Sequence, residues 1–178
     1  MVRILVEIVL LCGGRDSGKS GTLDELFRES TVKKVPFIEL NGKKICICGG
    51  KKSVQEVNEF CQYDRVIEEI KRRVALCIKK YGGNIIIIIP FTVEVGGRKM
   101  STKGKINRDC ILEPLKWLKT NYKTYVVYLS GGRRTNDISL IETLMQEIKY
   151  GIKIESRDKP IEQAKELSDF IIRNIQAG

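Results

Sequence analysis

Hydrophobic positions along the chain follow two kinds of pattern. Nearly continuous apolar runs occur in Arg3–Cys12 and Ile85–Ile89, and such runs are typical of strands buried on both faces of a parallel sheet. In Lys19–Glu29 and Asp64–Tyr81 the apolar residues recur every three or four positions, which predicts amphipathic helices. The second of these predicted helices ends at Gly82-Gly83, a typical C-cap.

A hairpin and further alternating elements complete the pattern. Asn41-Gly42 separates two short apolar runs, and this dipeptide favours a type I′ turn because it tolerates positive φ at both positions. The hairpin strands are predicted at Val35–Leu40 and Lys43–Cys48, later helices at Cys110–Asn121, Ile138–Tyr150 and Ile161–Gln176, and later strands at Thr124–Leu129 and, at a sheet edge, Ile152–Glu155.

Alternation of strands with helices of this length predicts an α/β fold. We expect three layers: a doubly wound, mainly parallel sheet with one antiparallel hairpin strand, and helices on both faces. The 178 residues are enough for one core, so we expect a single domain over 1–178. Glu7 interrupts the first apolar run, and no run reaches the roughly 18 residues of a membrane helix. We therefore expect a cytoplasmic protein without a membrane partner.

Charge and composition limit the ligands and the catalytic groups that this chain can use. The net charge is +10, and residues 61–120 contribute most of it with 13 basic and 6 acidic side chains. Gly96–Arg108 holds five basic residues and no acid, which is typical of a solvated face or of a loop that meets phosphates of a nucleotide or nucleic acid. Histidine, the usual general base, is absent. The six cysteines show no metal-ligand spacing, so we expect buried reduced thiols.

The stretch GGRDSGKS between the first strand and the first helix matches G-x-x-x-x-G-K-[ST]. Its glycines let backbone N–H groups converge on phosphate oxygens at a helix N-terminus. Lys19 is expected to reach the β and γ phosphates, and the Ser20 hydroxyl to ligate Mg²⁺. The predicted nucleotide-binding residues here are Gly13, Gly14, Arg15, Asp16, Ser17, Gly18, Lys19, Ser20 and Gly21.

The motif and its strand–helix context resemble the P-loop NTPases, and the Asn41-Gly42 hairpin resembles the second and third strands of small GTPase-type domains. The resemblance implies an Asp-x-x-Gly at the end of the third strand. The chain reads Ile47-Cys48-Gly49-Gly50 there, so Gly50 is expected to offer its N–H to the γ-phosphate while the acid is missing. The Asn-Lys-x-Asp that selects guanine is also missing, since Thr124–Leu129 leads into Ser130-Gly131-Gly132-Arg133-Arg134.

A carboxylate for the metal-bound water or for base catalysis is therefore sought elsewhere. Glu94, four residues beyond the isoleucine run and Pro90, is the first candidate, and with Lys19 it forms the predicted catalytic pair. Glu39 and Asp64 are weaker candidates, and Asp16 is a candidate for orienting water. Without a firmly positioned base we expect slow hydrolysis.

Two basic clusters follow predicted strands, at the edge where ligands of open α/β sheets bind. One contains Arg98, Lys99, Lys103, Lys105 and Arg108, and the other contains Arg133 and Arg134. Solvated loops are one interpretation of both. The other is a lid over the nucleotide, as the resemblance to small-molecule and nucleotide kinases implies, or a surface for anionic partners.

Three functions stay open from the sequence. The first is a Mg²⁺-dependent nucleoside-triphosphate binder and slow NTPase, with ATP favoured over GTP only by default. The second is a kinase of a small molecule or nucleotide. The third is a nucleic-acid-interacting protein that uses the 96–108 segment and binds nucleotide for regulation.

Overall fold

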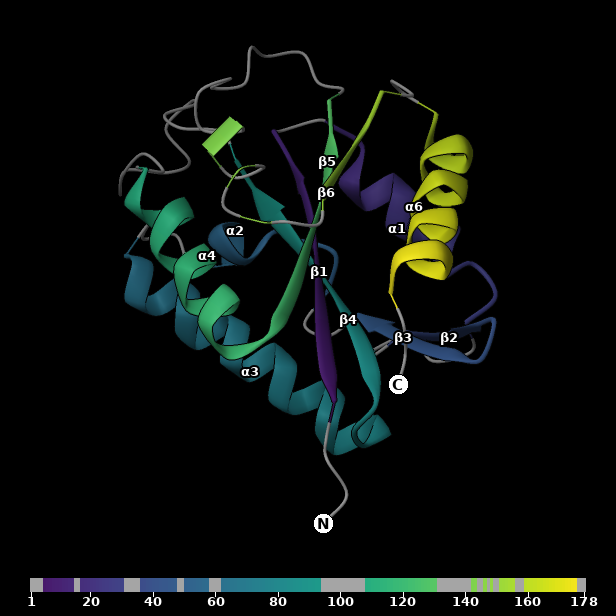
Figure 1. Ribbon diagram of the computed structural model, residues 1–178, viewed down its shortest axis with the longest axis horizontal. Coiled ribbons are helices and arrows are strands. Elements are labelled where there is room, and N and C mark those ends of the chain that lie inside the picture. Colours follow the sequence, from purple (N-terminus) through teal and green to yellow (C-terminus); the bar gives the residue numbers. More distant parts are fainter. Residues whose placement is uncertain are drawn as a thin grey trace.

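A single mixed sheet forms the centre of the computed structural model (Figure 1). The structure describes residues 5–14, 17–30, 36–47, 50–57, 62–93, 108–130, 142–143, 146, 148, 151–155 and 159–175. Strands within these ranges lie in the order β2-β3-β4-β1-β5-β6, and every neighbouring pair is parallel except β2 with β3. The strands are β1 (Val6–Gly13), β2 (Phe37–Leu40), β3 (Lys43–Ile47), β4 (Ile85–Thr92), β5 (Lys123–Leu129) and β6 (Gly151–Ile154).

The predicted hairpin is confirmed. Asn41 and Gly42 have φ values of 50° and 75°, the positive pair that a type I′ turn requires, and β2 runs antiparallel to β3 at one edge of the sheet. The predicted edge strand near residue 152 is confirmed as β6, which pairs with β5 at the opposite edge.

The isoleucine strand extends beyond the predicted run, through Pro90 to Thr92. A proline inside a sheet removes one ladder donor, and its position explains why the strand tolerates it. The N–H groups of Ile85 and Val93 face β1, so the amide position of residue 90 faces the β3 side instead. The described pairing of β3 with β4 ends at Ile47 and Ile88, two residues before Pro90.

Helices cover both faces of the sheet, which confirms the three-layer α/β prediction (Figure 1). Successive residues of a strand point to opposite faces, so Ile8 and Leu10 pack on one side and Val9 and Leu11 on the other. One face carries α2 (Val54–Val57), α3 (Tyr63–Tyr81) and α4 (Asp109–Asn121), and the other carries α1 (Lys19–Leu26) and α6 (Pro160–Asn174).

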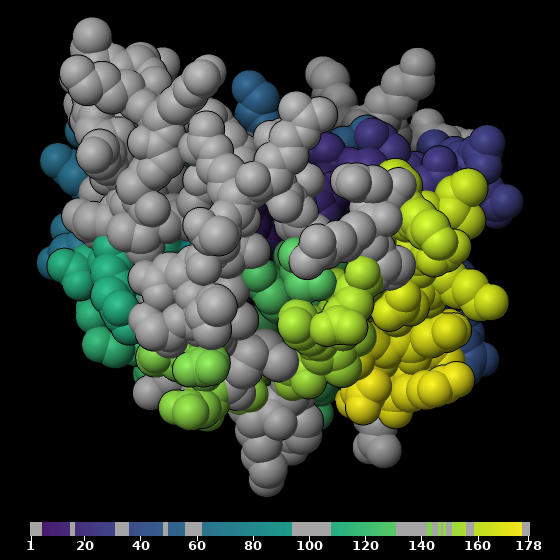
Figure 2. Space-filling model, turned by 90° about the horizontal axis from the view of Figure 1, so that it is seen from above, coloured from purple at the N-terminus to yellow at the C-terminus, as the bar shows by residue number. Residues whose placement is uncertain are grey.

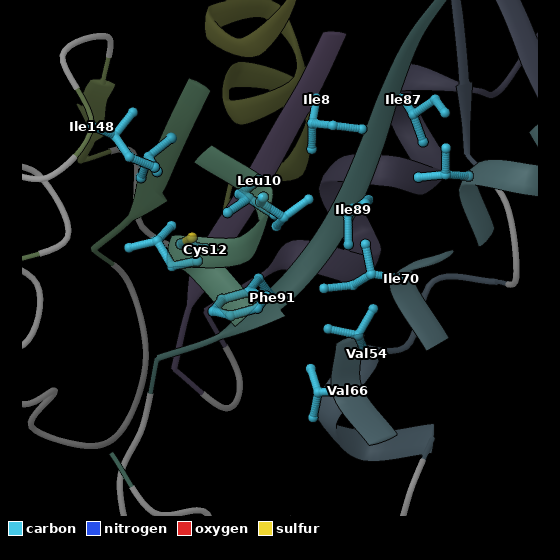
Figure 3. Packing of buried hydrophobic residues seen from close by; sticks show 14 of the residues in the cluster. Ile8, Leu10, Cys12, Val54, Val66, Ile70, Ile87, Ile89, Phe91 and Ile148 are labelled. Atoms are coloured by element: carbon cyan, nitrogen blue, oxygen red, sulfur yellow. The ribbon is translucent and has the colours of Figure 1, made fainter. Parts of the chain in front are cut away.

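The core on the α3 side shows how the short helix α2 is held. Figure 3 shows Val54 of α2 and Val66 and Ile70 of α3 gathered beside Ile89 and Phe91 of β4. All five side chains are buried. Helix α2 carries no signal in the sequence, because four residues are too few to show a helical period.

Most of the predicted helix Ile138–Tyr150 lies outside the described residues, although Glu142, Thr143 and Gln146 are helical. Within the described ranges, no helix has the length and apolar character needed to cross a membrane.

Candidate functional site

The predicted phosphate loop joins the end of β1 to the start of α1. Because β1 lies between β4 and β5, the loop leaves the sheet centrally at its carboxyl edge, where open α/β sheets bind ligands. Figure 2 views the molecule from this edge and shows α1 (purple) beside α6 (yellow), in agreement with the packing of Gly21 of α1 against Pro160 of α6. Two loop residues, Arg15 and Asp16, lie outside the described residues.

Two glycines fix the conformation of the loop. A Cβ at Gly13 would lie 2.2 Å from the Ser17 hydroxyl oxygen and 3.3 Å from the Leu129 carbonyl oxygen, so the loop folds back tightly over the strand ends. Gly18 has a φ of 91°, a left-handed conformation that favours glycine, immediately before α1 begins. The motif therefore occupies the tight strand-to-helix turn that it requires. The strand order and this turn agree with the P-loop α/β fold predicted from the sequence.

The Lys19 side chain is buried and turns back into the loop. Its ammonium nitrogen donates hydrogen bonds to the carbonyl oxygens of Gly13, at 2.9 Å, and Gly14, at 2.8 Å, and lies 3.4 Å from the Ser17 hydroxyl oxygen. A buried ammonium requires such partners. The loop thus holds its cation within the turn, next to the N-terminus of α1, where an anion is favoured.

Ser20 and Gly21 occupy the first turn of α1 in different environments. Ser20 is exposed, so its hydroxyl is accessible to a ligand. A Cβ at Gly21 would approach Cγ of Pro160 to 3.1 Å, which ties this glycine to the close packing of α1 against α6.

The end of β4 lies beside the loop, and hydrogen bonds with Gln55 and Ser53 hold its last residue, Thr92. Thr92 pairs with Gly13 in the parallel register, and the N–H of Val93 donates to the Gly13 carbonyl oxygen at 3.3 Å. The Gln55 amide bonds both the N–H and the carbonyl oxygen of Thr92, at 3.0 and 3.1 Å, and the Thr92 hydroxyl donates to that of Ser53 at 2.9 Å. The strand next to the loop thus ends in a buried hydroxyl, not a carboxylate.

The segment after β3 is attached to helices on both faces of the sheet. Strand β4 lies between β3 and β1, so Gly50 follows a strand that is one removed from the loop strand. Gly50 has a φ of 92°, Lys51 forms an ion pair with Asp24 of α1, and Arg73 of α3 donates to the Lys52 carbonyl oxygen at 3.0 Å.

Several predicted site residues cannot be placed in this geometry. Gly49, Glu94, Arg98, Lys99, Lys103, Lys105, Arg133 and Arg134 lie outside the described residues, so the kinase and nucleic-acid alternatives, which rest largely on them, stay predictions. Arg108 precedes the first turn of α4. Glu39 is exposed on β2 opposite Lys44, and Asp64 is exposed in the first turn of α3. Across the described ranges, no group of three or more acidic or cysteine side chains has the arrangement of a metal site.

The cysteine prediction is confirmed in part. Cys12, one residue before the loop, and Cys46 of β3 are free and buried. Burial raises the pKa of each thiol to about 12, and the nearby Lys19 ammonium opposes this only partly at Cys12, so neither thiol is a ready nucleophile. For Cys77 and Cys110 the expectation of reduced thiols is wrong, because both are disulfide-bonded.

Three polar residues around the loop escaped the sequence analysis: Thr22 of α1, Gln163 of α6 and Gln55 of α2, all buried. A signal existed for Gln163, which shares the apolar face of its helix with Leu167 and Phe170. Periodicity shows that a polar residue is buried but not which distant group it contacts.

Comparisons with known proteins show only remote likeness. Neither a protein-family model nor a curated protein sequence matches the chain. Among solved structures, a probable GTP-binding protein engB is 16% identical with a TM-score of 0.45, covering 93% of this chain and 96% of its own. The FeoB G-domain from Methanococcus jannaschii is 15% identical with a TM-score of 0.41, and the match covers 96% of this chain and 100% of that domain. A putative nucleolar GTP-binding protein 1 from Plasmodium falciparum is 16% identical with a TM-score of 0.46, and the match covers 97% of this chain and 89% of its own. We base the fold on strand order and loop geometry, not on these likenesses.

Proposed function

We propose that this protein binds a Mg²⁺-nucleoside triphosphate in the loop Gly13–Ser20 and hydrolyses it slowly. The observation that carries the proposal is the Lys19 ammonium, buried within the loop between the carbonyl oxygens of Gly13 and Gly14. A cation held in a glycine-rich turn at a helix N-terminus suits phosphate, because N–H groups, helix dipole and charge all favour an anion there.

Each loop residue then has a defined task. Lys19 exchanges its carbonyl partners for phosphate oxygens, and the backbone N–H groups of the loop bind the remaining oxygens. Ser20 supports the fit of Mg²⁺, because its exposed hydroxyl is a hard oxygen ligand and Mg²⁺ takes its other ligands from phosphates and water. When bound, Mg²⁺ neutralises part of the phosphate charge.

Slow hydrolysis follows from the polar groups beside the loop. Thr92, Ser53 and Gln55 bond to one another, and none of them is a carboxylate that could accept a proton from water. We propose Glu94 as the residue that orients the attacking water and Gly50 as a donor to the γ-phosphate. We expect turnover on the order of 10⁻⁴ to 10⁻³ s⁻¹, which is typical of a P-loop NTPase acting without an activating partner.

We propose ATP ahead of GTP, because the segment after β5 reads Ser130-Gly131-Gly132 and carries no guanine-selecting Asn-Lys-x-Asp. The nucleic-acid alternative rests on charge in the 96–108 segment, and steep salt dependence of binding to DNA or RNA would be its signature.

The test is calorimetric titration of ATP and GTP, with and without Mg²⁺, into the wild type, Lys19→Ala, Ser20→Ala and the control Lys116→Ala. Lys116 is an exposed lysine paired with Glu113 on α4. Loss of the charge-assisted contacts of Lys19 is expected to weaken binding by about 10- to 100-fold. Ser20→Ala is expected to reduce the gain in affinity that Mg²⁺ provides, and Lys116→Ala to change neither property.

Phosphate release is followed in the same samples, with Glu94→Gln compared against Glu113→Gln. A wild type that binds neither nucleotide refutes the proposed function. Equal affinity of the wild type and Lys19→Ala refutes the assignment of the loop, and equal turnover of Glu94→Gln and Glu113→Gln refutes the role of Glu94.

A further inference from the structure

Gln163 of α6 is fully buried against the phosphate loop, although it lies more than 140 positions away in sequence. Its amide oxygen lies 2.8 Å from the Thr22 hydroxyl oxygen, and its amide nitrogen donates to the Ser17 carbonyl oxygen at 3.4 Å. The Thr22 hydroxyl also lies 2.8 Å from the Gly18 carbonyl oxygen, and its single proton is donated to one of these two acceptors at a time.

The absence of a side chain at Gly18 leaves room for the Gln163 amide. A Cβ at Gly18 would lie 2.7 Å from the amide oxygen of Gln163, so the amide packs directly against the glycine backbone. Glycine at 18 and glutamine at 163 therefore fit each other in shape as well as in hydrogen bonding.

These contacts set the orientation of two successive peptide groups. A trans peptide directs its C=O and N–H to opposite sides, so fixing a carbonyl also aims the N–H of the next residue. Gln163 holds the Ser17 carbonyl oxygen, and the N–H and hydroxyl of Thr22 hold that of Gly18. The N–H groups of Gly18 and Lys19 are thereby directed away from α6 and α1, toward the side of the loop where phosphate would bind.

We infer that Gln163 is a positioning residue for phosphate binding: from α6 it presets the Ser17–Gly18 peptide so that the Gly18 N–H faces the ligand. The inference rests on the proposed function, because it concerns the same loop. It assigns to the last described helix a task in the site that the loop motif does not contain. The recognised chemistry is the polyphosphate chain, independent of the base.

The experiment compares Gln163→Met, which keeps the length of the side chain and removes the amide, with Phe170→Leu. Phe170 is buried on the same helix, among residues of the α6-side core, so its truncation weakens the fold without touching the loop. Affinities for MgATP, MgGTP and tripolyphosphate are measured along with melting temperatures. Gln163→Met is expected to weaken all three ligands by a similar factor of about three to ten. Phe170→Leu is expected to lower the melting temperature and leave the affinities unchanged.

A spectroscopic readout isolates positioning from general stability. In ¹⁵N-labelled protein, the Gly18 amide resonance is expected to shift on adding tripolyphosphate to the wild type and to shift less in Gln163→Met. If Gln163→Met does not fold, Thr22→Val serves as the second variant, because it removes the hydroxyl that both the Gln163 amide and the Gly18 carbonyl contact.

The outcomes separate the inference from the function on which it rests. A wild type that binds none of the three ligands overturns the proposed function. A wild type that binds them, with affinities and a Gly18 shift that Gln163→Met leaves unchanged, overturns only the role of Gln163. Equal loss of affinity in Gln163→Met and Phe170→Leu also overturns it, because the loss would then come from stability alone.

Discussion

Gly18 and Gly42 form a natural pair for testing how the phosphate loop is held, because both have positive φ in different surroundings. Their φ values are 91° and 75°. A Cβ at Gly42 meets nothing within 4 Å, whereas a Cβ at Gly18 meets the Gln163 amide oxygen at 2.7 Å. Replacing either glycine by alanine introduces left-handed strain of about 1–2 kcal/mol. Only Gly18→Ala also displaces a buried, hydrogen-bonded side chain.

The difference in unfolding free energy between Gly18→Ala and Gly42→Ala measures the cost of displacing the Gln163 side chain. The Gln163 amide oxygen ends a flexible side chain and can move, but moving it breaks the contact with Thr22 and leaves a buried acceptor unsatisfied, at about 1–3 kcal/mol. We expect Gly18→Ala to lose about 2–5 kcal/mol of unfolding free energy and Gly42→Ala about 1–2 kcal/mol. Urea denaturation measures both, with unchanged m-values showing that the comparison is valid.

A double variant sharpens the test. In Gly18→Ala/Gln163→Ala the smaller side chain makes room for the new methyl group, so the two losses should be less than additive. The reasoning is refuted if Gly18→Ala is no more destabilising than Gly42→Ala, or if the double variant loses the full sum.

Two further predictions concern other parts of the fold. Cys12 and Cys46 keep their protons in the folded state up to about pH 12, whereas the unfolded thiols ionise near pH 9. The free energy of unfolding should therefore fall between these pH values, by up to about 1.4 kcal/mol per pH unit for each thiol. Denaturation of Cys46→Ala across this pH range should show a shallower fall than the wild type. The Lys43 ammonium donates to the carbonyl oxygens of Ile171 and Ile172, at 3.1 and 2.6 Å, near the end of α6. We therefore expect Lys43→Met to lose about 1–2 kcal/mol of unfolding free energy in urea denaturation. Lys44 is an exposed neighbour, and an equal loss in Lys44→Met would contradict this role of Lys43.

Local patterns predicted most of the fold because each element carries its own signal. The isoleucine strand, the Asn41-Gly42 turn and the long helix α3 are all confirmed, since burial on two faces, positive φ and a helical period are properties of short segments. Strand order is a property of the whole chain. The position of β4 between β1 and β3 therefore could not be read from the sequence, and it places Thr92 beside the loop strand.

In the candidate site too, some features follow from a local motif and others depend on contacts between residues far apart in the sequence. The turn geometry of Gly13 and Gly18 and the helical start at Lys19 follow from a local motif, and the structure has the conformation that the motif requires. The contacts of Gln163 with the loop and of Gln55 with the end of β4 depend on side chains that reach from one helix to the loop, to another helix or to a strand end. Such contacts leave only an indirect trace in sequence, as a buried polar residue on an apolar helix face.

The contact between Thr22 and Gln163 spans 141 positions, and this separation bears on how the protein is made. The ribosome adds Thr22 to the chain 141 residues before Gln163, so a nascent chain carries the loop motif before its contact with α6 can form. Under the proposed function, nucleotide meets a loop supported by Gln163 only after α6 has been synthesised, and it then raises the free energy of unfolding with its concentration by mass action.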